Sequence, residues 1–200
     1  MKTLAVFASG SGSNLQSIID EIENNSLPAH IAFVLSNNSN AFALERARQY
    51  RIPAIHFSAV KFPDTREFDN KLLQLLVDNN VELIVLAGYM KLLPAIVVQA
   101  FKGKILNIHP GLLPKYGGKG MFGMNVHQAV IAGKEKESGA TVFFVTEAYD
   151  DGPVILCEKV PVLADDTPEL LAKRVLAVEH RIYPEAIRQV CSGRVVMSAD

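Results

Sequence analysis

Apolar and polar positions change their spacing in a regular order along the chain. In the first half, short apolar runs of strand length alternate with longer segments whose apolar residues recur at helical spacing. The runs predict strands over residues 4–9, 31–35, 54–57, 83–87 and 105–108. The amphipathic segments predict helices over residues 14–23, 41–50 and 65–79, with a short helix from Pro94. Because the strands are apolar on both faces, they are typical of a parallel sheet covered by helices on each side.

The second half shows a different pattern. Two apolar runs, residues 141–145 and 154–162, are separated by the turn DDGP at 150–153 without a helix, which predicts an antiparallel pair. A closing helix is predicted over residues 168–190, with a break or kink near Pro184. The fold class is therefore α/β: an open, mostly parallel, twisted sheet with helices on both faces, Rossmann-like, with an antiparallel C-terminal extension.

Composition narrows the class of protein. The 200 residues are 49% hydrophobic and 20% charged, which suffices for one substantial core, so we expect a single domain over residues 1–200. The net charge is −1 and the basic residues are scattered, which argues against nucleic-acid and membrane partners. Cys157 and Cys191 lie far apart in no metal or redox spacing, and the N-terminal apolar run is too short for a signal peptide. These features are typical of a cytoplasmic protein with reduced thiols.

A glycine-containing loop, ASGSGSN, follows the first predicted strand. Ligands of open α/β sheets bind at this carboxyl edge, and the backbone N–H groups of Gly12, Ser13 and Asn14 can bind an anion at the start of the helix. A dinucleotide is not favoured, because Leu15 stands where the third glycine of that fingerprint belongs and no acidic residue follows the second strand. The loop therefore predicts a site for a single phosphate, or else a tight turn that binds nothing.

Two polar side chains interrupt the last apolar run of the first half, KILNIHPGLLPKY. Asn107 and His109 are two residues apart, so in a strand they point to the same face at the carboxyl edge of the sheet. An amide can stabilise an oxyanion, and an imidazole can transfer a proton near neutral pH. A carboxylate from Asp150 or Asp151 would orient the ring. The set is suited to direct attack of a substrate nucleophile on a carbonyl, although a lone histidine is often a packed core residue.

Five motifs occur in a fixed order along nearly the whole chain. They are GSGSN from Gly10, LAGYMKLL from Leu86, NIHPGLLPKY from Asn107, DDGPVI from Asp150 and EHRIYP from Glu179. Together they resemble the phosphoribosylglycinamide formyltransferases (glycinamide ribonucleotide transformylases) of the folate-dependent formyltransferase family. The resemblance implies the formyltransferase fold. It also implies transfer of a formyl group from 10-formyltetrahydrofolate to the amine of N1-(5-phosphoribosyl)glycinamide in de novo purine biosynthesis, by direct attack through a tetrahedral intermediate and without a metal.

The resemblance also implies roles for individual residues. The catalytic set is Asn107, His109 and Asp150, and the alignment prefers Asp150 over Asp151. The residues that would bind the ribonucleotide are Gly12, Ser13, Asn14, Leu176, Ala177, Val178 and Glu179. The residues that would bind the folate are Arg66, Met90, Lys91, Leu92, Leu93, Asn107, Thr146, Glu147, Ala148, Tyr149 and Asp150. The implied partners are these two small molecules, and the implied assembly is a monomer or a homodimer.

Some positions depart from the family pattern. The segment 117–125 is longer than usual and rich in glycine and methionine, which suggests a mobile flap near the active site. Lys91, Phe143 and Leu176 replace residues that are common in the family, which bears on contacts with folate and ribose rather than on the chemistry.

Other interpretations stay open at the level of sequence. Taken alone, Arg66 at a helix start is more often a solvated charge, and Glu179 is more often an exposed helix residue. His127, beside the flap, is a weaker second candidate for the site. The competing functions are a formyltetrahydrofolate deformylase, in which water replaces the amine, and a mononucleotide-binding module without catalysis.

Overall fold

The computed structural model describes residues 1–197, which divide into two compact units. Unit 1 is Met1–Leu106, and unit 2 begins at Asn107. The boundary falls inside strand β5 (Ile105–His109). The single domain expected from the sequence stays a prediction.

Unit 1 is built on parallel strands. β1 (Lys2–Phe7) pairs with β2 (Ala29–Ser36) on one side and β4 (Leu83–Leu86) on the other, and β2 pairs with β3 (Ala54–His56). Residues 4–8 are 0% exposed, which explains why this stretch is apolar on both faces. Such burial stabilises the fold by roughly 25 cal/mol for each Å² of apolar surface.

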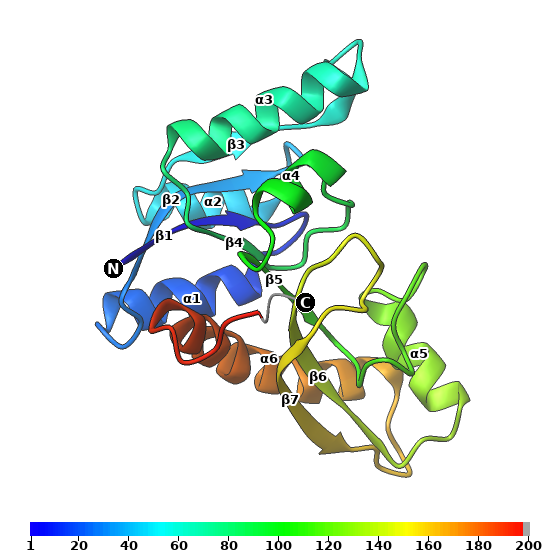
Figure 1. The fold of residues 1–200 in the computed structure, drawn as a ribbon. Coiled ribbons are helices and arrows are strands. Elements are labelled where there is room, and N and C mark those ends of the chain that lie inside the picture. The colour runs from blue at the N-terminus through cyan, green and yellow to red at the C-terminus, as the bar shows by residue number, and fades with distance from the viewer. Residues whose placement is uncertain (198–200) are drawn as a thin grey trace. The chain divides into compact units, whose positions relative to one another are not determined.

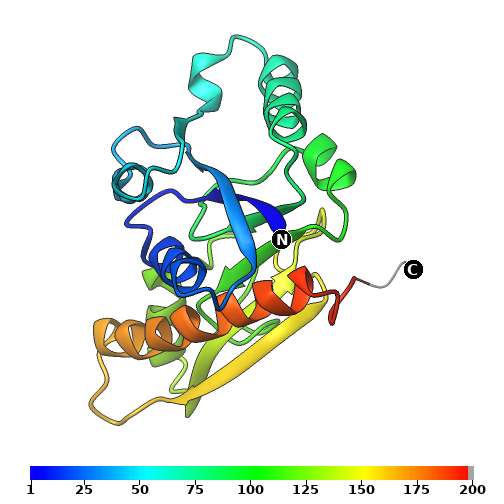
Figure 2. The ribbon, with the colours of Figure 1, turned by 90° about the vertical axis from the view of Figure 1, so that its left-hand side faces the viewer.

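Helices cover both faces of the unit 1 strands (Figure 1). They are α1 (Ser13–Glu23), α2 (Phe42–Gln49), α3 (Thr65–Asp78) and α4 (Ala95–Ala100), with a short 3-10 turn at η1 (Ala59–Lys61). α1 and α2 lie on one face, and α3 and α4 lie on the opposite face (Figure 2). Leu15, Ile18 and Ile19 of α1 are buried, as the helical spacing predicts.

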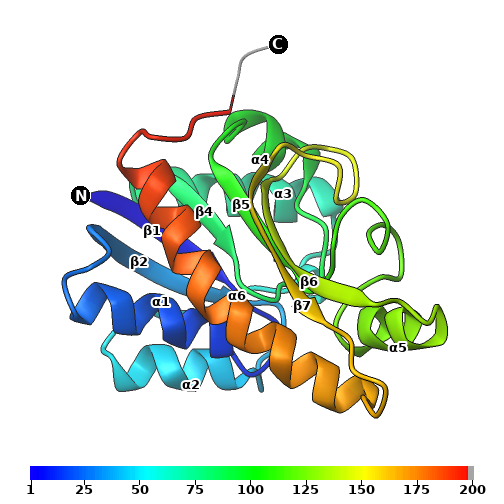
Figure 3. The same ribbon diagram turned by 90° about the horizontal axis from the view of Figure 1, so that it is seen from below.

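Unit 2 combines an antiparallel strand pair with two helices. Its elements after β5 are α5 (Met124–Ala132), β6 (Glu137–Phe144), β7 (Val154–Pro161) and α6 (Pro168–Cys191). α6 packs along β6 and β7 and also contacts α5 (Figure 3). Thr167 caps α6 by accepting a hydrogen bond from the Leu170 N–H at 3.3 Å.

The predicted fold class is confirmed. The strands are hydrogen-bonded in the order β3-β2-β1-β4-β5-β6-β7, a mostly parallel sheet in which β6 and β7 form the antiparallel extension. Each predicted strand and helix is present, with its ends shifted by a few residues.

Two expectations about helices need correction. Of the break or kink predicted near Pro184, the break is wrong, because α6 runs unbroken from Pro168 to Cys191, and the kink stays a prediction. Proline removes one helical N–H, but Pro184 lies on a buried face beside Tyr183 and Ala186, and this packing outweighs the lost hydrogen bond. The flap predicted over residues 117–125 overlaps α5, which begins at Met124. The sequence does not predict this helix, because the segment before it is rich in glycine and methionine.

Candidate active site

The end of β5 carries the two polar residues that the sequence singled out. Asn107 is half-buried and His109 is 4% exposed, both on the same face of the strand by their spacing. Ile108, between them, is buried on the opposite face. Gly111 follows closely, because a Cβ there would lie 3.0 Å from His109 Nε2 and 2.9 Å from Val126 Cγ1. The imidazole is therefore enclosed by the turn that follows its own strand.

A backbone carbonyl fixes the tautomer of His109. Nε2 lies 2.6 Å from the carbonyl oxygen of Tyr116. A carbonyl oxygen only accepts hydrogen bonds, so Nε2 carries a hydrogen and donates it. Nδ1 faces Asp150, with 3.9 Å to Oδ2, beyond hydrogen-bonding distance. Nδ1 is thus the nitrogen that gains and loses a proton.

Asp150 is held by its backbone and by a neighbouring amide. The residue has φ 49°, a left-handed conformation that is uncommon outside glycine. Its Oδ2 accepts a hydrogen bond from the Gly118 N–H at 2.9 Å. Two residues on, a Cβ at Gly152 would lie 1.6 Å from the Phe144 carbonyl oxygen, so only glycine fits there. These constraints favour Asp150 over the exposed Asp151 as the carboxylate of the set.

Burial and charge act in opposite directions on the histidine. Burial lowers the pKa of His109, while the Asp150 carboxylate and the hydrogen bond to Tyr116 raise it, and the net effect is a lowered pKa. His127 of α5 is also 4% exposed, and its Nδ1 has no hydrogen-bond partner among residues 1–197. Burial and the charge of His109 both lower the pKa of His127. A positive charge on His109 therefore disfavours protonation of His127.

The glycine loop of unit 1 forms the start of α1. Gly12 has φ 71°, and a Cβ there would lie 2.8 Å from Ala43 Cα, so the position requires glycine. No side chain caps this helix, and no acidic residue stands in its first turn. The Arg46 Nε donates a hydrogen bond to the Ser11 carbonyl at 2.9 Å, which fixes the loop and brings a positive charge to it. The backbone amides at residues 12–14, at the start of this helix, are therefore a candidate anion site.

The remaining predicted residues differ in burial. Glu179 of α6 is only 7% exposed, so the interpretation as an exposed helix residue is wrong. Arg66 is exposed at the first turn of α3. In the folate segment Leu93 is buried, whereas Met90 and Leu92 are 51% and 62% exposed. Exposed apolar side chains of this kind are suited to covering a flat ligand.

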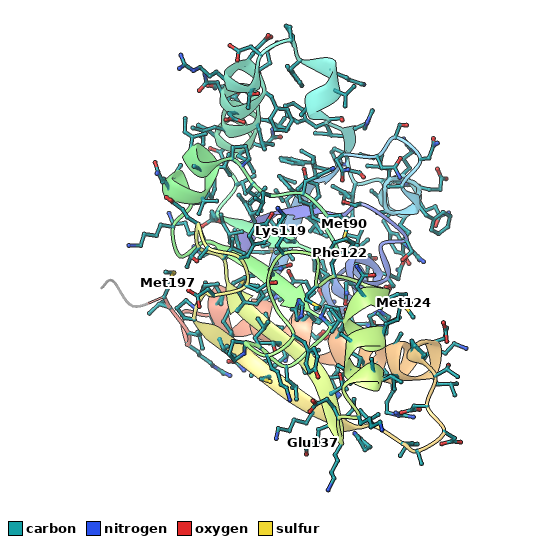
Figure 4. All side chains as sticks on the ribbon, turned by 90° about the vertical axis from the view of Figure 1, so that its right-hand side faces the viewer. Met90, Lys119, Phe122, Met124, Glu137 and Met197 are labelled. Atoms are coloured by element: carbon teal, nitrogen blue, oxygen red, sulfur yellow. The ribbon has the colours of Figure 1, made fainter. Side chains whose placement is uncertain are left out.

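The remaining predicted site residues of unit 2 lie in the turn before Asp150, in the segment before α5 and on α6. Thr146 begins the turn between β6 and β7, where its hydroxyl accepts a hydrogen bond from the Ala148 N–H at 3.3 Å. Lys119 and Phe122 lie along the segment that leads into α5, and Met124 is the first residue of that helix (Figure 4). Phe122 is 52% exposed. Leu176 and Ala177 precede Glu179 on α6 and are less buried than it.

The structure brings His109 and Asp150 together and adds two groups that sequence reasoning missed. These groups are the Tyr116 carbonyl, which accepts a hydrogen bond from His109, and the Gly118 N–H, which donates one to Asp150. Both belong to the backbone, so no side-chain pattern could have indicated them. Within residues 1–197, no group of three or more histidine, cysteine, aspartate or glutamate side chains is arranged to hold a metal ion. None of the helices in this range is long and apolar enough to cross a membrane.

Comparison with known proteins shows that the chain is similar to formyl-transferring enzymes in sequence and in fold. Residues 2–187 match the family model described as formyl transferase. Phosphoribosylglycinamide formyltransferase of Haemophilus influenzae is 44% identical over 195 residues, which cover 98% of this chain and 90% of that protein. Glycinamide ribonucleotide transformylase 1 from Symbiobacterium toebii has a TM-score of 0.93 at 42% identity, covering 100% of this chain and 92% of that chain. A formyltetrahydrofolate deformylase from Pseudomonas syringae has a TM-score of 0.88 at 25% identity, covering 98% of this chain and 63% of that chain.

Proposed function

Because the chain belongs to the formyl transferase family, we propose that it transfers the formyl group of 10-formyltetrahydrofolate to the amine of N1-(5-phosphoribosyl)glycinamide. This reaction is a step of de novo purine biosynthesis. The observation that carries the proposal is the approach of His109 Nδ1 to Asp150 Oδ2 at 3.9 Å in unit 2. His109 is the last residue of β5, the strand that also carries Asn107. The full-length likeness to enzymes with this activity supports the choice of substrates.

The reaction needs no covalent enzyme intermediate. The amine nitrogen of the ribonucleotide attacks the formyl carbon, and the carbonyl oxygen becomes an oxyanion. The Asn107 amide and the protonated Nδ1 of His109 donate hydrogen bonds to that oxygen. The intermediate collapses when the bond between the formyl carbon and folate N10 breaks. The attacking amine loses one proton and N10 gains one, so the reaction is balanced.

Asp150 has two roles in this scheme. Its negative charge favours the imidazolium form of His109, which burial alone would disfavour. With the ring held by Tyr116, the carboxylate also relays the amine proton towards N10 through water. The pair thus supplies both the positive charge for the oxyanion and a path for the proton.

Other residues bind the two substrates. The backbone amides of Gly12, Ser13 and Asn14 bind the phosphate of the ribonucleotide, and the buried Glu179 binds its glycinamide and ribose end, next to Leu176, Ala177 and Val178. Residues that contact the folate are Arg66, Met90–Leu93 and Thr146–Asp150. We further propose that the enzyme acts in the cytoplasm, as a monomer or a homodimer.

A formyl-transfer assay tests this function. Purified protein is mixed with 10-formyltetrahydrofolate, with and without the ribonucleotide, and tetrahydrofolate and formate are measured separately. We expect tetrahydrofolate release only when the ribonucleotide is present, with no formate. Formate release independent of the amine would instead identify a deformylase, the less similar relative in both identity and coverage. Ligand binding without any release would identify a binding module.

A further inference from the structure

Residues 115–118, here called the bridging segment, contact both members of the catalytic pair. The Tyr116 carbonyl accepts the hydrogen of His109 Nε2 at 2.6 Å. Two residues later, the Gly118 N–H donates to Asp150 Oδ2 at 2.9 Å. A Cβ at Gly117, between them, would lie 2.5 Å from Leu113 Cδ2 and 3.1 Å from Asp150 Cβ, so the segment is closely packed. A shift of this backbone would change the orientation of the imidazole and the carboxylate together.

One side chain outside the pair anchors the bridging segment. Glu135 Oε1 accepts a hydrogen bond from the Tyr116 hydroxyl at 2.9 Å and an ion-pair contact from Lys115 Nζ at 2.7 Å. Glu135 stands just beyond α5, where its N–H donates to the Val130 carbonyl at 3.3 Å. A Cβ at Gly133 would lie 2.7 Å from the Tyr116 hydroxyl, so the phenol also packs against the end of the helix.

Glu135 is kept in its ionised form by Lys115 and Tyr116, the residues that it binds. Hydrogen bonds from Lys115 and Tyr116 lower the pKa of Glu135. The carboxylate is therefore ionised at neutral pH, and it gives the Tyr116 hydroxyl a strong acceptor. The exposed Lys115 side chain contributes little to the stability of the fold, so the part-buried hydrogen bond from the Tyr116 hydroxyl is the contact that ties Glu135 to the bridging segment.

We propose that Glu135 is a positioning residue, which holds the bridging segment so that the Tyr116 carbonyl fixes the His109 tautomer and the Gly118 amide fixes Asp150. Glu135 itself does not contact the reacting atoms. The inference rests on the catalytic role proposed above for His109, and it extends the active site to a side chain beyond α5. In metal sites, groups that orient a ligand from the outer shell change affinity or activity by about 10- to 100-fold when removed, and we expect an effect of the same order here.

Variants of the anchor and a matched control test the proposal. Glu135→Ala removes the acceptor, Glu135→Gln retains an acceptor oxygen, and Tyr116→Phe removes only the hydroxyl. The control is Glu137→Ala: Glu137 lies two residues further along, at the start of β6 (Figure 4), and is paired with Lys159 at 2.8 Å. This pair is also a lysine–glutamate pair, with a lysine of similar exposure (63% against 64%) and a more exposed glutamate (54% against 26%), and it does not involve the bridging segment.

Two readouts separate positioning from stability. The first is the ¹⁵N spectrum of the His109 ring in the ligand-free protein, assigned by comparison with His109→Gln, which distinguishes Nε2–H from Nδ1–H in the neutral imidazole. The second is the pair kcat and KM, with a thermal melt to confirm folding. For Glu135→Ala and Tyr116→Phe we expect a growing Nδ1–H population and a fall in kcat of about 10- to 100-fold. KM should change little, Glu135→Gln should recover part of the loss, and Glu137→Ala should resemble the wild type.

The outcomes distinguish this inference from the proposed function. An unchanged His109 spectrum in both Glu135→Ala and Tyr116→Phe would overturn the positioning role, whatever the activity. A changed spectrum with unchanged kcat would leave the anchor in place but contradict the catalytic role of His109. Equal losses in Glu135→Ala and Glu137→Ala would also overturn the inference, because they would indicate a general effect of surface charge.

Discussion

His109 Nδ1 faces Asp150 Oδ2 across 3.9 Å, although the two residues are far apart in the sequence and lie on different elements of unit 2. The histidine ends β5, and the aspartate lies in the turn between β6 and β7. Because Nε2 is committed to the Tyr116 carbonyl, the nitrogen that faces the carboxylate is the one whose protonation changes. The carboxylate favours the imidazolium form of His109, whereas burial of the ring disfavours it and leaves the net pKa of His109 lowered.

Removing the carboxylate should shift the pH dependence of the reaction to lower pH. His109 acts as the imidazolium, so the rate falls as pH rises through its pKa. Asp150 raises that pKa, so Asp150→Asn should lower it and move the falling limb of the kcat profile towards acid. At neutral pH we expect kcat to drop by roughly 10²-fold. Asp151→Asn, at the exposed neighbouring position, should keep the wild-type profile; an identical shift in both variants would contradict the assignment.

The glycine loop should tolerate alanine at one glycine and not at the other. Gly12→Ala places a Cβ 2.8 Å from Ala43 at a φ of 71°, so we expect a loss of about 1–3 kcal/mol in the free energy of unfolding. The KM for the ribonucleotide should also rise, because the phosphate amides move. Gly10→Ala is the control, since nothing lies within 4 Å of its Cβ position. Urea unfolding and steady-state kinetics measure both effects, and equal behaviour of the two variants would count against the loop as the phosphate site.

Much of the fold could be predicted because the spacing of apolar residues in a strand depends on which of its faces are covered. Residues 4–8 are apolar without alternation, and this pattern requires cover on both faces, which the helices provide. The placement of Asn107 and His109 on one face of β5 was equally predictable, because side chains two residues apart in a strand point to the same face. The sequence was less informative about α5, whose N-terminal part follows a glycine-rich loop and carries apolar side chains that are exposed in the structure, such as Met124.

The parts of the site that could not be predicted are held by tertiary contacts. The partners of His109 and Asp150 in the bridging segment are backbone groups, which any residue type would supply. The burial of Glu179, by contrast, is indicated by its position in the sequence. It lies four residues after Val175 and three before Ile182, within the buried stripe of α6, so helical periodicity alone indicates a carboxylate on the covered face.

The buried carboxylate of Glu179 should contribute to binding of the ribonucleotide. Glu179→Gln retains the shape of the side chain but removes its charge. A hydrogen bond to a charged group is worth about 1.5–3 kcal/mol, so the KM for the ribonucleotide should rise roughly 10- to 100-fold while the KM for the folate stays unchanged. Lys173→Gln, at an exposed position of the same helix, is the matched control. A variant that loses stability but keeps the wild-type KM would show that Glu179 is only structural.

The N-cap of α6 should affect stability without affecting catalysis. Thr167 accepts a hydrogen bond from the Leu170 N–H, and Thr167→Ala should lower the free energy of unfolding by about 1 kcal/mol. Thr167→Ser retains the hydroxyl and should restore most of the loss. The kcat of both variants should equal that of the wild type. A large fall in kcat would mean that the start of α6 is coupled to the reaction, which the scheme above does not include.

In the proposed mechanism, Asn107 and His109 stabilise the oxyanion of formyl transfer. The most direct measurement is the single-turnover rate of tetrahydrofolate formation in Asn107→Ala and His109→Ala, at saturating concentrations of both substrates and with circular dichroism to confirm folding. We predict that each variant is slower than the wild type by about 10²–10³-fold, the usual cost of removing one oxyanion donor. A folded variant with a near-wild-type rate would contradict the role of the missing side chain and, with it, the proposed mechanism.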